Sequence, residues 1–173
     1  MRVGSALVIT LVLGGARSGK SAVGEEMTAS LPQPVTYVAT LQVGDDPDLA
    51  ARVEAHRARR PPEWRTVEAG VELPDVLRDV RGSVLVDSLG PWVGAAGGAV
   101  SHTESLCTAL RQRHGDTVVV SEEVGLSVHP STEAGRRFRD ALGVLNQAVA
   151  ELADEVVLVV AGRTLRLDQG PLR

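Results

Sequence analysis

Short runs of consecutive apolar residues, rich in valine, recur along the chain between longer stretches that mix apolar and charged positions. Such runs are typical of strands buried on both faces of a parallel sheet, whereas the mixed stretches are typical of amphipathic helices. The pattern predicts six strands and a short edge strand, over residues 7–13, 35–39, 64–68, 83–87, 117–121, 155–160 and, at the edge, 163–167.

Helical patterns fill most of the intervals between these runs. Pro32 and Pro61 end the first two, because proline cannot continue a helix. Residues 94–100, rich in glycine and alanine, predict a loop or a weak helix start. The predicted helices cover residues 20–31, 47–59, 72–80, 102–114 and 131–153.

The alternation of strands and helices predicts the architecture. It favours a mostly parallel sheet flanked by helices on both faces. The sequence shows no internal repeat and no linker, and a chain of 173 residues fits one hydrophobic core. We therefore expect residues 1–173 to form a single α/β domain.

Composition and charge narrow the function classes. Apolar residues make up 43% and charged residues 23%, as in ordinary soluble proteins. The formal net charge of −4 gives no support to nucleic-acid binding. Basic residues cluster locally, between Arg52 and Arg65 and between Arg136 and Arg139, which suits a small phosphorylated ligand better than a polymer.

The single cysteine, Cys107, permits no internal disulfide and no metal site made of cysteines. It lies in a predicted helix without a basic neighbour to activate it, so we expect a buried, inert thiol. The absence of disulfides favours a reducing compartment, and hence the cytoplasm.

The start of the chain imitates a signal peptide, with Met1-Arg2 followed by an apolar run and small residues. We reject this interpretation because the run leads directly into the glycine-rich segment described next, and cleavage there would destroy it. No apolar stretch reaches the length of a membrane span.

A glycine-rich segment with the spacing of a phosphate-binding loop lies between the first predicted strand and the first predicted helix. Glycines let the backbone approach phosphates closely, and the loop N–H groups then point at the anion beside the helix N-terminus. In such loops the lysine reaches the β- and γ-phosphates and the serine hydroxyl binds Mg²⁺. The alternative is a glycine-rich turn with a solvated lysine. The segment comprises Gly14, Gly15, Ala16, Arg17, Ser18, Gly19, Lys20 and Ser21.

Asp87 ends the buried run Val84-Leu85-Val86. An acid at the tip of such a strand lies beside the phosphate loop in this fold class and can hold magnesium through water. The alternative role is a helix N-cap, since a turn begins here. Glu122 and Glu123 follow another predicted strand and are further candidates for the acid.

A histidine lies within a strongly basic predicted helix. Arg52 lies one turn before His56, and Arg59 and Arg60 lie one turn after it. Nearby guanidinium groups disfavour the imidazolium, and a neutral imidazole can attack an activated phosphorus to form a covalent phospho- or nucleotidyl-histidine. The alternative is a structural His56 that shares a helix face with Val53 and packs on the core, with the arginines solvated.

Several segments in order along the chain resemble one known family. The phosphate loop has a Gly-Ala-Arg-Ser interior, and the chain continues with Tyr37-Val38-Ala39-Thr40, the histidine segment from Arg52 to Pro61, Val84 to Leu89, and Glu123 to Leu126. Together they resemble the bifunctional adenosylcobinamide kinase / adenosylcobinamide-phosphate guanylyltransferase family of cobalamin biosynthesis. The segments span almost the whole chain.

The resemblance implies a phosphate-loop NTPase fold of the RecA-like type and two reactions. A nucleoside triphosphate, ATP or GTP, phosphorylates the aminopropanol hydroxyl of adenosylcobinamide, and GTP then transfers GMP to that phosphate through a guanylyl-histidine. It assigns this histidine to His56, and the phosphate and magnesium roles to Lys20, Ser21 and Asp87. It also implies a homotrimer. Further expected nucleotide contacts are Thr40, Arg57, Arg60 and Glu68.

The sequence departs from the family pattern at three places. Glu122 stands where the family usually has asparagine, and Ser127 and His129 stand where it has glycine and valine in Gly-Leu-Gly-Ile-Val-Pro. Residues 91–96 are smaller than the usual bulky helix. These changes leave the nucleotide chemistry intact and concern the acceptor side of the site.

Two other hypotheses remain open at this stage. One is a phosphate-loop kinase for a small metabolite, in which His56 is only structural. The other is a nucleotide-binding switch or module without acceptor chemistry, although the chain has no Asn-Lys-x-Asp segment for reading guanine.

Overall fold

The computed structural model describes residues 7–41, 47–97 and 100–168. Its centre is a seven-stranded sheet in the order β3-β2-β4-β5-β1-β6-β7. Six strands are parallel, and β7 pairs antiparallel with β6. The strands are β1 (Ile9–Gly14), β2 (Val35–Ala39), β3 (Arg65–Glu68), β4 (Ser83–Asp87), β5 (Thr117–Glu122), β6 (Glu155–Val160) and β7 (Arg163–Leu167).

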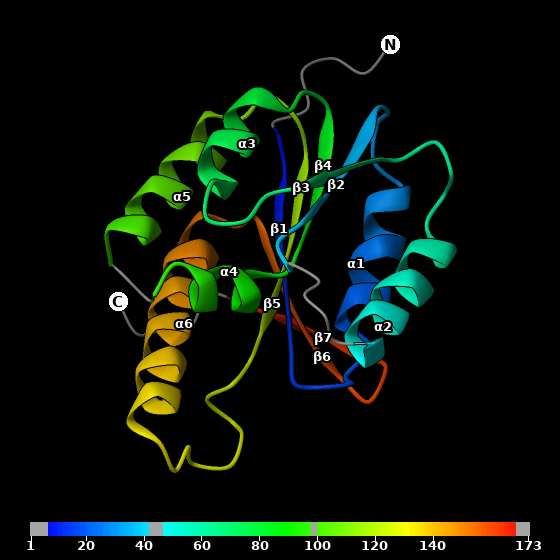
Figure 1. Ribbon diagram of the computed structural model, residues 1–173. Coiled ribbons are helices and arrows are strands. Elements are labelled where there is room, and N and C mark those ends of the chain that lie inside the picture. Colours follow the sequence, from blue (N-terminus) through cyan, green and yellow to red (C-terminus); the bar gives the residue numbers. More distant parts are fainter. Residues whose placement is uncertain (1–6, 42–46, 98–99, 169–173) are drawn as a thin grey trace.

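Helices cover both faces of this sheet, as Figure 1 shows with the sheet nearly edge-on. The pair α1 and α2 lies on one face, and the other four helices lie on the opposite face. The helices are α1 (Lys20–Ala29), α2 (Pro47–Arg59), α3 (Leu73–Asp79), α4 (Leu89–Ala95), α5 (Val100–Gln112) and α6 (Glu133–Leu152).

Each sheet face has its own hydrophobic core. Leu11, Val86 and Val119 point toward the larger cluster, which includes Trp92 and Leu145 from α4 and α6. Alternate strand residues point the other way into a smaller cluster, against which side chains of α1 pack. This double burial explains why the strands are continuous apolar runs rather than alternating ones.

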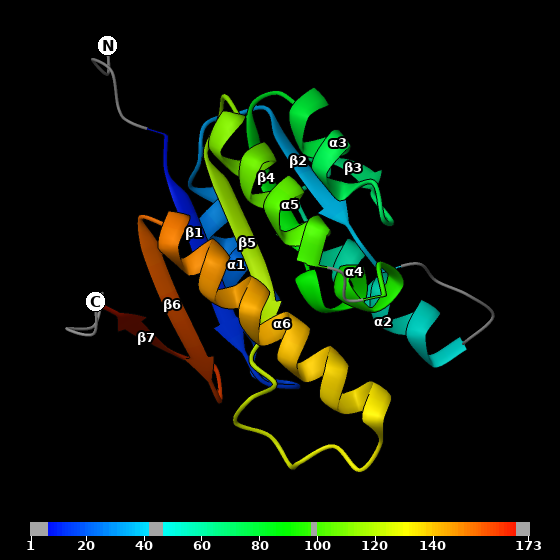
Figure 2. The same ribbon diagram turned by 90° about the vertical axis from the view of Figure 1, so that its left-hand side faces the viewer.

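The strand order determines which side chains meet. The strands β2, β4, β5 and β1 are neighbours and run parallel, so their carboxyl ends lie at one edge of the sheet (Figure 2). That edge carries Gly14 at the end of β1, Asp87 at the end of β4 and Glu122 at the end of β5. Ligands of open α/β sheets bind outside such an edge.

The predicted α/β class and all seven predicted strands are confirmed; the bounds of four strands agree fully, and those of β1, β3 and β5 differ by one or two residues. One element was missed. This is the helix α4, from Leu89 to Ala95. We predicted no helix over residues 89–93 and a loop or weak helix start from residue 94 onward. Gly90, Pro91 and Gly94 weaken its helical signal. Tertiary packing stabilises this helix despite its weak intrinsic propensity, because the Trp92 side chain is buried in the core and only 1% exposed.

Two of the sequence-based expectations fall partly outside the described residues. They are the signal-like segment, whose residues 1–6 are not described, and the basic helix, in which the side chain of Arg52 is not described. Within residues 7–41, 47–97 and 100–168, no helix has both the length and the apolar character of a membrane span.

Candidate active site

The phosphate loop connects β1 to α1 at the carboxyl edge of the sheet. A Cβ at Gly14 would collide with the Ser18 hydroxyl, and Gly19 has φ +95°, a conformation that favours glycine. The turn between β6 and β7 supports the loop from outside, because the Gly162 N–H donates to the Ser18 carbonyl at 2.8 Å. The loop and the helix N-terminus that follows it can therefore accept an anion.

The side chains of the phosphate loop differ in whether they point inward or into solvent. The ammonium of Lys20 lies 3.4 Å from the Gly15 carbonyl, and its side chain is 13% exposed. The side chains of Ala16 and Arg17 are exposed, and Arg17 has φ 55°. Lys20 is thus the loop cation held inward, where a bound phosphate would lie.

Asp87 accepts hydrogen bonds from two hydroxyls that come from different elements. Ser21 Oγ donates to Oδ1 at 3.1 Å, and Tyr37 OH donates to Oδ2 at 3.0 Å. The side chain of Asp87 is 8% exposed. The Ser21 hydroxyl and the Asp87 carboxylate are hard oxygen ligands within one coordination sphere of each other, which is the donor chemistry that Mg²⁺ prefers.

His56 reaches the same carboxylate from α2. Its Nδ1 lies 3.9 Å from Asp87 Oδ2, and its side chain is 32% exposed. Sequence spacing pointed only to the arginines of the same helix as neighbours of this imidazole. The carboxylate was missed as a neighbour because it comes from β4, which is distant in sequence.

Arg60 is held in place by contacts with Tyr37, the His56 carbonyl and the Thr66 hydroxyl. Its guanidinium carbon lies 3.7 Å from the centre of the Tyr37 ring, and its Nε donates to the His56 carbonyl at 3.3 Å. Stacking on an aromatic ring orients a guanidinium without neutralising it. The Arg60 charge therefore remains available to an anionic ligand.

A cavity of about 650 Å³ joins these groups. Of the residues predicted as contacts, Arg57, Arg60 and Glu68 line it. It is also lined by residues that the sequence analysis did not single out, such as Tyr37 and Ser88. The other predicted site residues that line it are Lys20, Ser21, His56 and Asp87.

Thr40 is placed differently from the other predicted contacts. It is 2% exposed, it donates to the Ser88 carbonyl, and it accepts from the Ser88 N–H at 3.1 Å. Its side chain is not among those that line the cavity. Thr40 therefore connects the end of β2 to the start of α4 by hydrogen bonds and supports the cavity wall without facing the cavity.

Glu122 occupies the gap between the phosphate loop and α4. Its Oε1 lies 3.7 Å from Lys20 Nζ and accepts from Ser88 Oγ at 2.6 Å, and its Oε2 accepts from the Gly90 N–H at 2.7 Å. Of the two adjacent glutamates at the carboxyl end of β5, this one faces the site. Glu123 instead bonds the nearby Gly125 N–H at 2.8 Å.

A second acid, Glu25 of α1, lies near Asp87 and His56. One ligand atom from each of these three residues lies within 4.8 Å of the others. Glu25 is already engaged by Arg59, whose Nε lies 3.4 Å from Oε2. The arrangement joins α1 to α2 beneath the cavity.

The surroundings of Tyr37 alter its ionisation. Burial, reinforced by the Asp87 carboxylate beside its hydroxyl, raises the pKa of Tyr37 well above its ordinary value. The phenol therefore stays protonated and donates its hydrogen bond to Asp87 across the neutral pH range. No sequence signal apart from its place in the second strand pointed to this residue.

Comparison with known proteins gives consistent matches. Residues 10–167 match the family described as cobinamide kinase / cobinamide phosphate guanyltransferase. The bifunctional adenosylcobalamin biosynthesis protein CobP of Pseudomonas aeruginosa is 39% identical over 171 residues, covering 94% of this chain and 98% of that protein. The corresponding CobU protein of Escherichia coli K12 is 36% identical over 177 residues, covering 90% and 97%.

Solved structures support the fold. An ATPase from the type III secretion system of pathogenic bacteria superimposes with a TM-score of 0.54 at 13% identity, over 87% of this chain. The chain spans about half the length of that ATPase, 50%. This likeness confirms the predicted phosphate-loop fold, and the sequence matches confirm the resemblance. The chain belongs to the cobinamide kinase / cobinamide phosphate guanyltransferase family.

Proposed function

We propose that this protein phosphorylates the aminopropanol hydroxyl of adenosylcobinamide and then transfers GMP from GTP to the new phosphate. One observation carries the proposal. A nucleophilic imidazole, His56, lines the same cavity as the phosphate-loop residues Lys20 and Ser21. A kinase needs only the loop, whereas a covalent nucleotidyl transfer also needs a nucleophile within reach of the α-phosphorus.

In the guanylyl transfer, the imidazole is the group that changes bonds. With Nδ1 facing Asp87, Nε2 is the nitrogen that attacks the α-phosphorus of GTP. The N–P bond forms as the bond from that phosphorus to the bridging oxygen breaks, and pyrophosphate leaves. A phosphate oxygen of cobinamide phosphate then attacks the same phosphorus, the N–P bond breaks, and free His56 returns.

The surrounding residues support this exchange electrostatically. Lys20 and the loop N–H groups hold the phosphates, and Arg57 and Arg60 face the cavity beside His56. The Asp87 carboxylate, 3.9 Å from Nδ1, stabilises positive charge on the imidazole as the N–P bond forms.

Magnesium is the expected cofactor. Ser21 and Asp87 supply the hard oxygen atoms that would hold it, and a bound ion would neutralise charge on the phosphates.

Labelled GTP tests the proposal directly. The protein is incubated with Mg²⁺ and α-labelled GTP and then denatured, beside His56→Ala and a His114→Ala control; His114 is exposed and does not line the cavity. We expect label on the wild type and the control, absent from His56→Ala, and stable in alkali but not in acid. An unlabelled wild type, or equal label on His56→Ala, would refute the assignment.

We also infer that the 173 residues act as one domain, in a cytoplasmic homotrimer. The resemblance to the family supports the trimer, and the single cysteine supports a reducing compartment. Sedimentation equilibrium tests the assembly, with a mass of three times 18.2 kDa expected. A monomeric mass at assay concentrations would contradict it.

A further inference from the structure

Glu122 lies between the phosphate loop and the expected magnesium ligand. The strand β5 lies between β1 and β4 in the sheet, where β1 leads into the phosphate loop and β4 ends at Asp87. Because neighbouring parallel strands end at the same edge, the last residue of β5 lies between Lys20 and Asp87. Glu122 is that residue, it lines the phosphate-loop cavity, and its side chain is 24% exposed. Neither the magnesium site nor the guanylyl transfer uses its carboxylate.

The two oxygens of this carboxylate have different surroundings. Oε2 accepts from the Gly90 N–H at 2.7 Å. Oε1 accepts from Ser88 Oγ at 2.6 Å and lies 3.7 Å from Lys20 Nζ. Each carboxylate oxygen has two lone pairs, so the Oε1 lone pair that Ser88 does not use is available on the side of the ammonium. A γ-phosphate bound by Lys20 would therefore lie beside Oε1 of Glu122.

Contacts with two helices hold this carboxylate in place. The side-chain amide of Asn146, from α6, donates to the Glu122 carbonyl at 3.0 Å. At Gly90, in the first turn of α4, an added Cβ would collide with Oε2 of Glu122. Glycine at this position therefore lets the carboxylate reach the Gly90 N–H. The charge is fixed between Lys20 and the start of α4.

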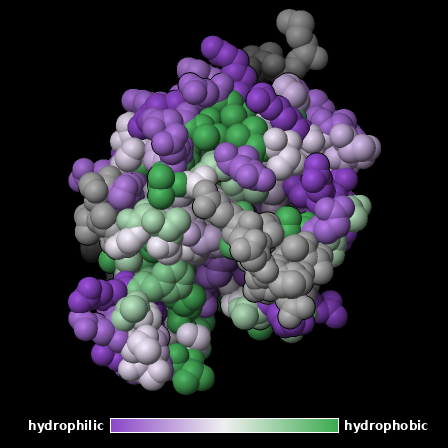
Figure 3. Space-filling view, viewed as in Figure 1, coloured by the Kyte–Doolittle hydropathy of each residue, from purple (hydrophilic) through white to green (hydrophobic). Residues whose placement is uncertain are grey.

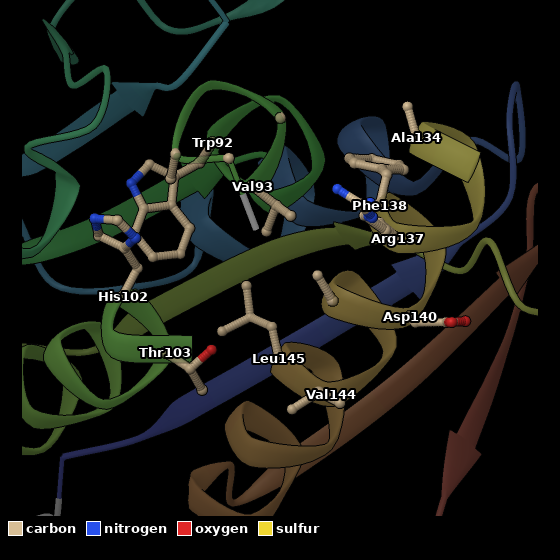
Figure 4. A pocket seen from close by; sticks show the side chains of 14 residues that line it. Trp92, Val93, His102, Thr103, Ala134, Arg137, Phe138, Asp140, Val144 and Leu145 are labelled. Carbon is tan, nitrogen blue, oxygen red and sulfur yellow. The ribbon is translucent and has the colours of Figure 1, made fainter. Parts of the chain in front are cut away.

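The helix α4 is itself anchored by apolar packing. Its side chains Trp92 and Val93 are 1% and 5% exposed, and they face Phe138 and Leu145 of α6 across a cavity (Figure 4). Where this region reaches the surface, hydrophobic side chains gather over α4 and α6 (Figure 3). This packing holds the N-terminal end of α4, and its hydrogen bonds to Glu122, in a fixed position.

We propose that Glu122 is the general base of the kinase step. The acceptor hydroxyl oxygen attacks the γ-phosphorus of the triphosphate, the bond from that phosphorus to the β,γ-bridging oxygen breaks, and the nucleoside diphosphate leaves. Oε1 of Glu122 takes the hydroxyl proton as the new O–P bond forms and later releases it to solvent. The proposal rests on the proposed function and adds a catalytic residue to its first reaction.

The other carboxylates of the cavity are placed less well for this task. Within the part of the chain that the structure describes, the carboxylates that line the cavity are those of Glu68, Asp87 and Glu122. Asp87 accepts from Ser21 and Tyr37 and is the expected magnesium ligand. Glu68 ends β3, which lies four strands away from β1, or roughly 19 Å across the sheet. Of the three, Glu122 is the one beside the cation of the phosphate loop.

A glutamate at this position distinguishes the chain from the family pattern, which usually has asparagine here. An asparagine amide can accept a hydrogen bond from a hydroxyl and orient it, but it cannot take the proton. The family reaction therefore does not require a base at this position, and Glu122 adds proton transfer to orientation. General bases contribute roughly hundredfold to ten-thousandfold to a rate. Removal of the base should slow the reaction without abolishing it.

Replacing Glu122 by glutamine tests the proposal, beside Glu123→Gln as the matched control. Glutamine keeps hydrogen bonds to Ser88 and Gly90 but cannot take a proton, whereas Glu123 bonds Gly125 and does not line the cavity. Single-turnover transfer of label from γ-labelled ATP and from γ-labelled GTP to adenosylcobinamide measures the chemical step. We expect Glu122→Gln to slow this step by about hundredfold, with the cobinamide concentration for half-maximal rate little changed. Glu123→Gln should match the wild type.

Labelling of His56 by α-labelled GTP separates this proposal from the proposed function. That reaction uses no acceptor hydroxyl, so Glu122→Gln should form the adduct as the wild type does, which also shows that the variant folds. Phosphorylation at the wild-type rate by Glu122→Gln would overturn the role of Glu122. An equal loss of adduct and phosphorylation would also overturn it, because Glu122 would then only hold the site together. A wild type that forms the adduct but transfers no γ-phosphate would refute the kinase reaction, and the role of Glu122 with it.

Discussion

The pairing of Lys20 with Glu122 means that a triphosphate must compete with a carboxylate for the phosphate-loop cation. Replacing Glu122 by glutamine removes this competition and the repulsion of the phosphates. The amide keeps the local hydrogen bonds, because its oxygen can accept from the Gly90 N–H while its NH₂ donates to the Ser88 hydroxyl. The change thus isolates the charge.

The size of the effect follows from the geometry. Two unit charges 3.7 Å apart attract by about 4 kcal/mol at an effective dielectric constant near 20. The side chains of Lys20 and Glu122 are 13% and 24% exposed, so water and salt screen the pair and solvation of the freed ammonium offsets part of the loss. We expect a net effect of about 1 kcal/mol, or roughly fivefold tighter GTP binding.

Isothermal titration with GTP, without acceptor, measures this change. Glu123→Gln is the matched control, since Glu123 adjoins the same strand end but bonds Gly125 instead of Lys20. The gain in affinity should shrink as salt is raised. Unchanged or weaker GTP binding by Glu122→Gln at low salt would show that the pair does not oppose the nucleotide.

Two further predictions concern ionisation and stability. The raised pKa of Tyr37 means that the folded state favours the protonated phenol, so the contribution of Tyr37 to stability is fully present below pH about 10 and is lost above it as the phenol of the unfolded chain ionises. Tyr37 is the only tyrosine, so ultraviolet titration reads it directly, and ionisation near pH 10 in the folded protein would contradict the assignment. Arg113 is 5% exposed and donates to three backbone carbonyls and one hydroxyl. We expect Arg113→Met to lower the free energy of unfolding in urea by roughly 3 kcal/mol, because two buried and two partly buried acceptors lose their donor. The exposed Arg111→Met should change the stability little, and equal stabilities of the two variants would disprove the role.

The strands were predictable from sequence because both faces of the sheet are covered. Val118, Val119 and Val120 form a continuous apolar run that only a strand buried on both sides explains. The helix α4 was not predictable, since Gly90 and Pro91 argue against a helix locally. It forms because Trp92 fills a space in the core that no local pattern reveals.

The site divides in the same way. The phosphate loop and Asp87 could be predicted because their signals are local: a fixed spacing, and an acid at the end of an apolar run. The contacts of His56 with Asp87 and of Tyr37 with Arg60 depend on how β2, β4 and α2 assemble, so sequence spacing could not predict them. The choice between Glu122 and Glu123 also needed the structure.

The position of β1 between β5 and β6 has a consequence for synthesis of the protein. Both neighbours of this strand come from the second half of the chain, and the turn that supports Ser18 contains Gly162. Contacts so distant in sequence form late, because the intervening chain must first exist and close. A nascent chain therefore carries the entire phosphate-loop sequence once residue 21 is made, but the strands and the turn that support the loop are complete only after residue 162.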